Sequence, residues 1–258
     1  MNNKRVHLSV HIERTAGTSL LAELVKEYGA DRTLLYQPQT DRLLKVSDIP
    51  ISPASKFLHN LKHRLEGTFL LRAIYNGYDK VVKWDKAVFK WISPEKIPEE
   101  TAAIHGHFSP QRFNGLIENP MTTVVLPDPL ERMISHYSHW KRTGGKAGWR
   151  IETPFDQSLG FVEFALREEM RNFQSKVLAG KKLQDFDYVG VTKKLDCFLS
   201  KIRGNGHGKA PNMHSVANKP KYAELGITEE FIKKFKKYNA RDYKNYSLAT
   251  QLASCNDG

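Results

Sequence analysis

The sequence has only two cysteines, Cys197 and Cys255, and it has no apolar run of the roughly 20 residues that a membrane-spanning helix needs. Two cysteines so far apart form neither a disulfide framework nor a metal-binding set, so we expect free thiols in a reducing compartment. The first strand pattern starts within a few residues of Met1, which leaves no room for a signal peptide. These three features predict a cytoplasmic protein without a membrane span.

Acidic residues are also scarce relative to basic ones. The 258 residues include 28 Asp and Glu against 40 Lys and Arg, which gives a formal net charge of +12. This excess favours anionic partners such as nucleotides, sulfated or acidic glycans, nucleic acid or anionic membranes, although it can also simply solubilise a surface. We find no internal repeat and no low-complexity linker, and the length suits one domain over residues 1–258.

Residues 6–24, VHLSVHIERTAGTSLLAEL, carry the first motif. An apolar run, a turn of small and hydroxyl residues and a helical pattern predict a strand, a tight loop and a helix. This arrangement directs backbone N–H groups and a helix N-terminus at one place, which favours a bound phosphate. The lysine and serine that end a Walker loop are missing, and Arg14 precedes the turn instead. An ordinary strand-to-helix turn is the alternative interpretation.

A second motif, IHGHF, covers residues 104–108. In a strand, His105 and His107 would lie on the same face because side chains alternate. Three interpretations remain open: part of a metal site, two structural histidines, or a general base with a pKa near neutrality. The sequence near these histidines offers no cysteine and no obvious carboxylate cluster to complete a metal site.

A third motif joins a β-branched strand over residues 122–126 to a helix. Asp128 is the expected N-cap and Pro129 the first helical residue. Leu130 and the apolar residues that follow it predict the buried face, with Ser135 beside this stripe and Arg132 on the polar side. As in the first motif, we expect the N-terminal N–H groups of this helix to be available to an anionic ligand.

Other patterns complete an α/β protein with a parallel sheet. We expect strands over residues 33–36 and 188–191, irregular chain over 41–53, and helices over 161–178 and 193–202. We also expect Gly29 to end the first helix and Thr228 to cap a closing helix. Residues 54–91 predict a basic helical insertion. Its aromatic and lysine side chains suit either a glycan or nucleic-acid platform or a packed helix with a solvated lysine face.

Together these segments resemble the carbohydrate-type sulfotransferases, above all the uronyl and heparan 2-O-sulfotransferases. Residues 10–20 resemble the family's H-I-P-K-T-A-G-T-S loop, 105–109 its H-G-H motif, and 126–137 its L-R-D-P-V-E-R-x-x-S-x-Y motif. Residues 172–180, 189–192 and 242–243 match further landmarks in the same order. The resemblance implies a three-layer, P-loop-like fold with a central parallel sheet flanked by helices. It also implies transfer of a sulfuryl group from 3′-phosphoadenosine 5′-phosphosulfate (PAPS) to a hydroxyl.

The resemblance also implies roles for individual residues. His107 would be the base, with His105 as its neighbour or substitute, and Ser135 would contact the 3′-phosphate. The loop that binds the 5′-phosphosulfate would consist of Arg14, Thr15, Ala16, Gly17, Thr18 and Ser19. Two departures matter: Arg14 and Glu13 replace the family's lysine and proline, and Pro127 replaces the arginine that grips the 3′-phosphate. Candidates to replace that arginine are Arg132, Arg142 and Lys219.

The leading hypothesis is therefore a PAPS-dependent sulfotransferase that acts on a hydroxyl-bearing acceptor, such as an acidic glycan. We expect no metal and no nucleic-acid partner. A relative that binds a nucleotide or glycan without turnover, and a P-loop small-molecule kinase, are the alternatives. Acceptor choice is expected to lie with residues 54–91, 140–150 and 203–215, but the sequence identifies neither the acceptor nor the oligomeric state.

Overall fold

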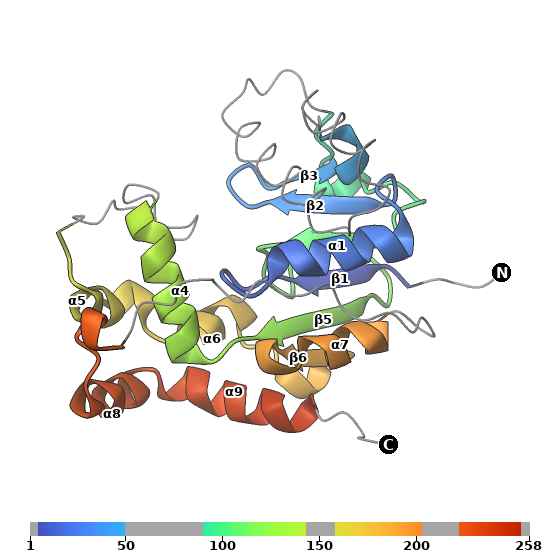
Figure 1. The fold of residues 1–258 in the computed structure, drawn as a ribbon. Coiled ribbons are helices and arrows are strands. Elements are labelled where there is room, and N and C mark those ends of the chain that lie inside the picture. The colour runs from blue at the N-terminus through green and yellow to red at the C-terminus, as the bar shows by residue number, and fades with distance from the viewer. Residues whose placement is uncertain (1–4, 50–89, 143–157, 203–221, 254–258) are drawn as a thin grey trace, which may run out of the picture. The chain divides into compact units, whose positions relative to one another are not determined.

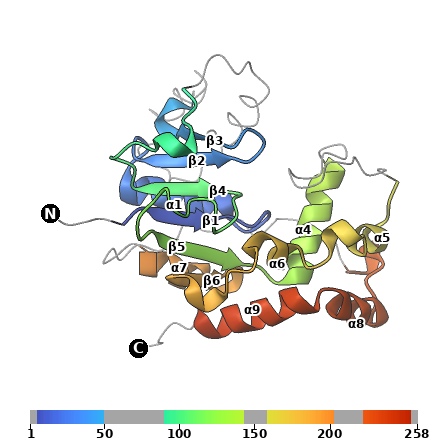
Figure 2. The ribbon, with the colours of Figure 1, turned by 180° about the vertical axis from the view of Figure 1, so that it is seen from behind.

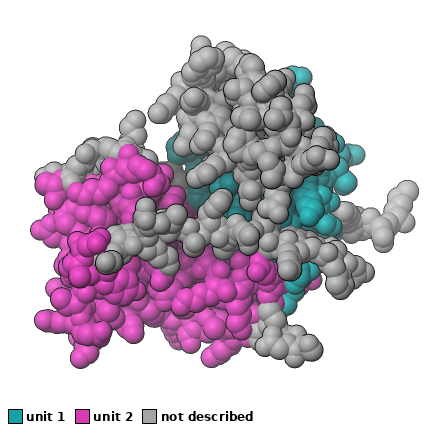
Figure 3. All heavy atoms as spheres, in the orientation of Figure 1, with its two compact units in different colours: residues 1–11, 16–123, 199–213 teal, residues 12–15, 124–198, 214–258 magenta. Residues whose placement is uncertain are grey.

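The computed structural model describes residues 5–49, 90–142, 158–202 and 222–253. The chain forms two compact units, which Figure 3 colours separately. Unit 1 contains residues 1–11, 16–123 and 199–213, and unit 2 contains residues 12–15, 124–198 and 214–258. Lys219, nearly all of the predicted insertion over 54–91 and most of the two predicted acceptor loops lie outside the described residues.

A six-stranded, mostly parallel sheet with flanking helices makes this an α/β fold (Figures 1 and 2). The strand order is β3-β2-β4-β1-β5-β6. Their bounds are His7–Val10 (β1), Thr33–Gln37 (β2), Arg42–Lys45 (β3), Ala103–Gly106 (β4), Met121–Leu126 (β5) and Tyr188–Val191 (β6). Both β1 and β2 run parallel to β4, whereas β3 is antiparallel to β2. The predicted parallel sheet is therefore confirmed in part, and β3 adds an antiparallel edge strand that was not predicted.

Strand β3 was expected to be irregular chain. The strand is only four residues long, and it is stabilised by burial of its side chains and by pairing with a distant residue. Leu43 and Leu44 are fully buried, and Leu43 exchanges two backbone hydrogen bonds of 2.8 Å with Ile92. The strand forms because it finds partners on both sides, which a four-residue pattern does not reveal.

In unit 1, helix α1 (Gly17–Tyr28) packs against β2 and β4. Leu20, Leu21 and Leu24 are buried, as their helical spacing predicts. The helix ends at Gly29, whose φ of 88° lies in the left-handed region that glycine adopts readily. This helix fixes the position of the loop that precedes it.

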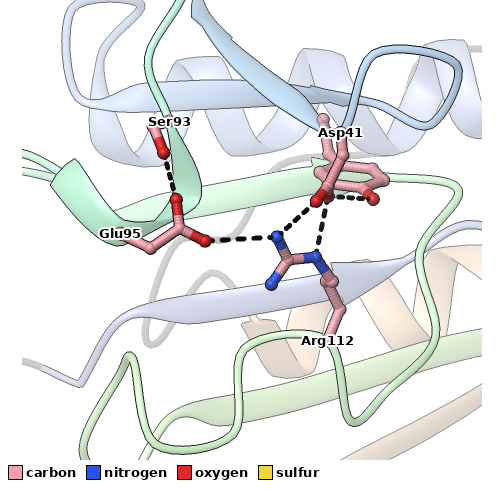
Figure 4. Close-up of polar contacts among 5 residues, drawn as sticks. Asp41, Ser93, Glu95 and Arg112 are labelled. Atoms are coloured by element: carbon pink, nitrogen blue, oxygen red, sulfur yellow. Dashed lines mark hydrogen bonds and ion pairs between the residues drawn. The ribbon is translucent and has the colours of Figure 1, made fainter.

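An ion cluster ties the loop after β4 to the turn between β2 and β3 (Figure 4). Arg112 donates two hydrogen bonds of 2.7 Å to the Asp41 carboxylate, and Tyr36 Oη donates a third, also of 2.7 Å. Glu95 lies 3.7 Å from Arg112 and accepts a hydrogen bond from Ser93. Arg112 holds the pKa of Asp41 below its usual range, and burial raises the pKa of Tyr36 to about 12.

Unit 2 is built mainly from helices. They are α4 (Pro129–Arg142), α5 (Phe161–Ala165), α6 (Phe173–Leu178), α8 (Glu229–Tyr238) and α9 (Ala240–Leu252), and α7 (Leu195–Ile202) begins in this unit. One aromatic-rich core joins α4, α5 and α8, and Trp140 and Phe164 are fully buried in it. Thr228 caps α8 by accepting a hydrogen bond from Phe231 N, as predicted.

Short 3-10 turns connect these elements. They are η1 (Val46–Asp48), η2 (Pro94–Lys96), η3 (Glu168–Met170), η4 (Leu183–Asp185), η5 (Thr192–Lys194) and η6 (Tyr222–Leu225). Because η3 interrupts the helix expected over residues 161–178, that prediction is wrong. Asn172 has a φ of 48° and exchanges hydrogen bonds with Asn239, Arg241 and Asp242, so contacts with α9 replace the continuous helix.

Two further findings concern the features that the sequence lacks. Cys197 is disulfide-bonded, so the expectation of two free thiols is wrong. Its Sγ lies 3.9 Å from Ala253 O at the end of α9, and the fold therefore brings distant parts of the chain to Cys197. Cys255, the other cysteine of the sequence, lies outside the described residues. Within the described chain, no helix has the length and apolar character needed to cross a membrane.

Candidate functional site

The predicted phosphate loop ends in unit 1 at the N-terminus of α1. Ala16, the N-cap, has a φ of 51° and forms no side-chain capping hydrogen bond. Its carbonyl accepts the first helical bond, from Leu20 N. The first-turn amides therefore receive no acceptor from a capping side chain, and their positive partial charges suit an anion. Thr18 and Ser19 add two half-buried hydroxyls beside these amides.

His11 packs directly on the first residue of this helix. A Cβ atom added at Gly17 would lie 2.0 Å from His11 Cε1 and 2.2 Å from His11 Nε2. Such distances are far inside van der Waals contact, so only glycine fits here. The His11 ring also stacks against the rings of His107 and His105, with centroids 4.3 and 5.1 Å away.

His107 is half-buried, and its orientation is fixed through one ring nitrogen. Nδ1 lies 2.9 Å from the backbone oxygen of His11. A carbonyl oxygen can only accept, so Nδ1 carries the hydrogen, and the lone pair of the neutral ring lies on Nε2. This is the tautomer that a general base acting through Nε2 requires.

His105 differs in character, although it belongs to the same motif. It is 1% exposed, and its Nδ1 lies 2.9 Å from Ser9 Oγ. Burial, and then the nearby charges of His107 and His7, lower its pKa to about 3. The ring therefore stays neutral near pH 7, which suits a structural neighbour of His107 better than a substitute base.

Gly106 separates these histidines for a steric reason. A Cβ atom there would lie 2.8 Å from the backbone oxygen of Tyr36, so β4 can pair closely with β2 only if this position is bare. Among the residues that the structure describes, no group of three or more His, Cys, Asp or Glu side chains could hold a metal ion. Through His11, the arrangement holds the His107 imidazole near the N-terminus of α1.

In unit 2, the other half of the loop meets helix α4. Arg14 is exposed, and its Nε donates a 3.2 Å hydrogen bond to Ser135 Oγ across 121 residues of sequence. The φ of Arg14 is 67°, a left-handed conformation that disfavours residues with a Cβ atom. The structure thus brings together two residues that the sequence assigned separately to nucleotide binding.

Arg132 was expected on the polar side of α4, and this expectation is wrong. Arg132 is 2% exposed, and its guanidinium carbon lies 3.8 Å from the centroid of the Phe173 ring. Its Nε donates a 3.3 Å hydrogen bond to the backbone oxygen of Glu13. Burial lowers its pKa to about 10, partly opposed by the carboxylates of Glu13 and Asp242. Arg132 therefore supports the loop from inside the protein, through the Glu13 backbone, instead of reaching into solvent.

Buried neighbours complete this support. His136 Nδ1 lies 3.5 Å from both Glu13 Oε2 and Arg132 Nη2. Burial, and then the charges of Arg132 and Arg14, lower the pKa of His136 well below its usual value, so this ring is neutral. Thr15 is 1% exposed, so its hydroxyl is enclosed by protein instead of lining an open loop.

The N-terminus of α4 differs from that of α1. Asp128 Oδ1 accepts hydrogen bonds of 3.0 and 3.1 Å from the amides of Leu130 and Glu131. This confirms Asp128 as the cap, but it also means that these amides are not presented to a ligand as expected. Pro127 is buried, and its carbonyl accepts a 3.1 Å hydrogen bond from Gln174 Nε2.

A hollow of about 720 Å³ lies in unit 2, where α4 begins, and no sequence pattern predicted it. Tyrosines, carboxylates, lysines and small polar groups dominate its lining. The lining residues are Asp128, Leu130, Glu131, Lys193, Tyr222, Ile232, Lys236, Tyr243, Tyr246, Ser247, Thr250 and Gln251. Five of these lie on α9, where no local motif marks them.

Comparison of the sequence with protein-family models and with curated proteins finds no match.

Proposed function

We propose that this chain is a PAPS-dependent sulfotransferase that modifies a hydroxyl group of a carbohydrate acceptor. The observation that carries the proposal is the grouping in unit 1 of His107, His11 and the uncapped N-terminus of α1. His107 carries its lone pair on Nε2, and His11 contacts both His107 and the first residue of the helix. A base is thus held beside a place where an anionic leaving group can be stabilised.

The proposed reaction is an in-line transfer. The acceptor oxygen attacks sulfur, and its proton passes to His107 Nε2. A new O–S bond forms while the bond between sulfur and the bridging 5′-phosphate oxygen breaks, which releases 3′-phosphoadenosine 5′-phosphate (PAP). The first-turn amides of α1 and the hydroxyls of Thr18 and Ser19 would stabilise the charge that develops on the departing phosphate. No metal is needed for this balance of charge and protons.

The charge of the protein supports the same choice of ligand. PAPS carries several negative charges, and a net charge of +12 favours the approach of such an anion. The missing Walker lysine argues against a kinase that uses ATP.

The test compares His107→Asn with the unaltered protein. The Asn amide can still donate to the His11 carbonyl, but it has no atom equivalent to Nε2. We expect PAP affinity in calorimetry to change less than about threefold, while transfer from sulfur-labelled PAPS falls by 100-fold or more, as expected for loss of a general base. The acceptor panel contains desulfated glycosaminoglycans, neutral sugars and simple alcohols.

His139→Ala, which removes a half-buried histidine from α4, is the matched control and should leave both quantities unchanged. Unchanged transfer by His107→Asn would remove His107 from the base role. Selective binding of ATP in place of PAP would overturn the donor assignment. If the unaltered protein binds PAP but transfers to no acceptor in the panel, a relative without turnover becomes the better interpretation.

A further inference from the structure

In unit 1, one tyrosine of β2, Tyr36, contacts the chain on both sides of His107. Before His107, Gly106 is the register partner of Tyr36 in the sheet. A Cβ atom on Gly106 would lie 2.8 Å from the Tyr36 backbone oxygen and 2.9 Å from Tyr36 Cβ. After His107, the Phe108 ring meets the Tyr36 ring edge to face, with centroids 5.6 Å apart. Both covalent neighbours of the proposed base are therefore packed against the same residue.

The contact with Phe108 belongs to a buried cluster of three rings. Phe113 packs edge to face on both of the others, with centroids 5.0 Å from Phe108 and 5.9 Å from Tyr36. Because each ring contacts the other two, none can move alone without opening a gap in a close-packed interior. The cluster therefore fixes both ends of the segment that follows His107.

The hydroxyl of Tyr36 is held as well as its ring. Its Oη donates a 2.7 Å hydrogen bond to Asp41 Oδ1, and burial raises the pKa of Tyr36 to about 12, so the hydroxyl keeps its proton. Arg112 donates to both oxygens of the same carboxylate, each at 2.7 Å (Figure 4). Two-point contacts of this kind fix geometry as well as adding energy. Since Arg112 directly precedes Phe113, the ion cluster and the ring cluster hold the same end of the segment.

The direction of the His107 ring depends on this support. Its Nδ1 lies 2.9 Å from His11 O, and a shift of the backbone at residue 107 would lengthen this bond and turn Nε2. We propose that Tyr36 is a positioning residue for His107: its ring fixes the chain on both sides of the base, and Asp41 and Arg112 fix the ring. This inference rests on the proposed function, in which His107 is the base.

The first test measures kcat and KM for transfer from sulfur-labelled PAPS. Tyr36→Leu removes the ring, so kcat should fall by roughly tenfold to a hundredfold, as for a displaced catalytic group. The KM for PAPS should change less than about twofold, because the donor does not contact Tyr36. Tyr36→Phe keeps the ring and loses one hydrogen bond, so kcat should fall by less than about fivefold. Arg112→Gln should have a similar effect, and the two changes should not add, since both act through Asp41.

A second test separates positioning from a general weakening of the fold. Tyr36→Leu is combined with His107→Asn, which already lacks the base. If Tyr36 acts through His107, the leucine should reduce the residual transfer no further. The same fold loss in both backgrounds would overturn the inference. Circular dichroism checks that each variant is folded. If Tyr36→Leu does not fold, unchanged kcat in both Tyr36→Phe and Arg112→Gln would overturn the inference in its place.

Tyr28→Leu is the matched control. Tyr28 is a tyrosine of the same unit with the same exposed fraction, 9%, and its hydroxyl lies 3.2 Å from His7 Nδ1, at the C-terminal end of α1. This variant should lose stability and keep its kcat. A fall in kcat as large as that of Tyr36→Leu would contradict a specific role for Tyr36.

NMR of ¹⁵N-labelled imidazoles supplies a measurement that needs no activity. The His107 signals are assigned as those absent from His107→Asn. The Nδ1–H form should predominate in the unaltered protein, and both tautomers should be populated in Tyr36→Leu or, more weakly, in Arg112→Gln. An unchanged tautomer in these variants would overturn the inference. If the unaltered protein transfers to no acceptor, the proposed function fails, and the tautomer measurement still decides whether Tyr36 orients His107.

Discussion

Replacement of Gly17 by alanine perturbs the contact between the histidine group and helix α1. The new Cβ atom would lie 2.0, 2.2 and 2.7 Å from three atoms of the His11 ring. The ring cannot turn away freely, because it stacks against His107 and His105. Overpacking of this kind costs about 1–3 kcal/mol, whereas alanine in place of glycine in a helix gains at most about 1 kcal/mol. We therefore expect a net loss of about 1–2 kcal/mol.

The assay is urea unfolding followed by circular dichroism, carried out as a double-mutant cycle with His11→Ala. Removing the imidazole removes the obstacle, so Gly17→Ala should become neutral or stabilising in the His11→Ala background. The two single effects should thus fail to add, with a coupling free energy of about 1–3 kcal/mol. Gly160→Ala is the matched glycine control, because its Cβ atom would meet only Glu163 Oε2, at 3.8 Å.

A specific result would refute this reasoning. If Gly17→Ala costs the same free energy with and without the His11 ring, then the steric contact does not determine the choice of glycine. PAP binding gives a second measure, since displacement of His11 should disturb the N-terminus of α1. A variant that is destabilised through the ring should therefore also bind PAP more weakly.

Two further predictions concern charged residues. Asp41→Asn should lower the free energy of unfolding by about 1 kcal/mol or less at pH 7, a small value because the Asp41 side chain is 54% exposed. Since Arg112 depresses the folded-state pKa of Asp41, this stabilisation is complete above the unfolded value of 3.8 and is lost as pH falls through the folded value. Urea titrations between pH 7 and pH 2 test this, and a difference that persists at pH 2 would contradict it. Arg14→Gly should raise the free energy of unfolding by up to about 1 kcal/mol, because it removes a side chain from a left-handed position. The same variant should bind PAP more weakly in calorimetry, and unchanged affinity would argue against a ligand contact.

Local sequence patterns predicted the elements that carry a clear pattern or cap within their own residues. The strands around residues 7–10 and 121–126, the Asp128 and Thr228 caps and the helix stop at Gly29 all follow from short-range rules. The misses have distant causes. Strand β3 depends on Ile92, and the break before α6 depends on partners on α9. The local sequence of β3, or of the chain before α6, does not reveal these distant partners.

The candidate site shows the same division. Motifs selected His107, Arg14 and Ser135 as candidate site residues, and the structure places each at a definite contact. Their surroundings could not be predicted in this way. Arg132 looks solvent-facing in its motif but is buried, and His105 resembles a second base until its burial is known. Burial decides both outcomes. It disfavours the charged form of the His105 imidazole, and it is tolerated for the Arg132 guanidinium only because that group has partners.

The buried Arg132 explains how an unfavourable loop conformation persists in unit 2. Its bond to the Glu13 carbonyl fixes the chain immediately before Arg14, and the aromatic face of Phe173 supports the guanidinium from the other side. Arg14 then adopts a φ of 67°, a conformation that its side chain disfavours, and in this conformation its Nε reaches Ser135. A left-handed residue with a large side chain survives only where its surroundings determine the backbone. The buried arginine thus determines the direction of the exposed one, and the loop relies on tertiary packing where a glycine would have sufficed for the turn alone.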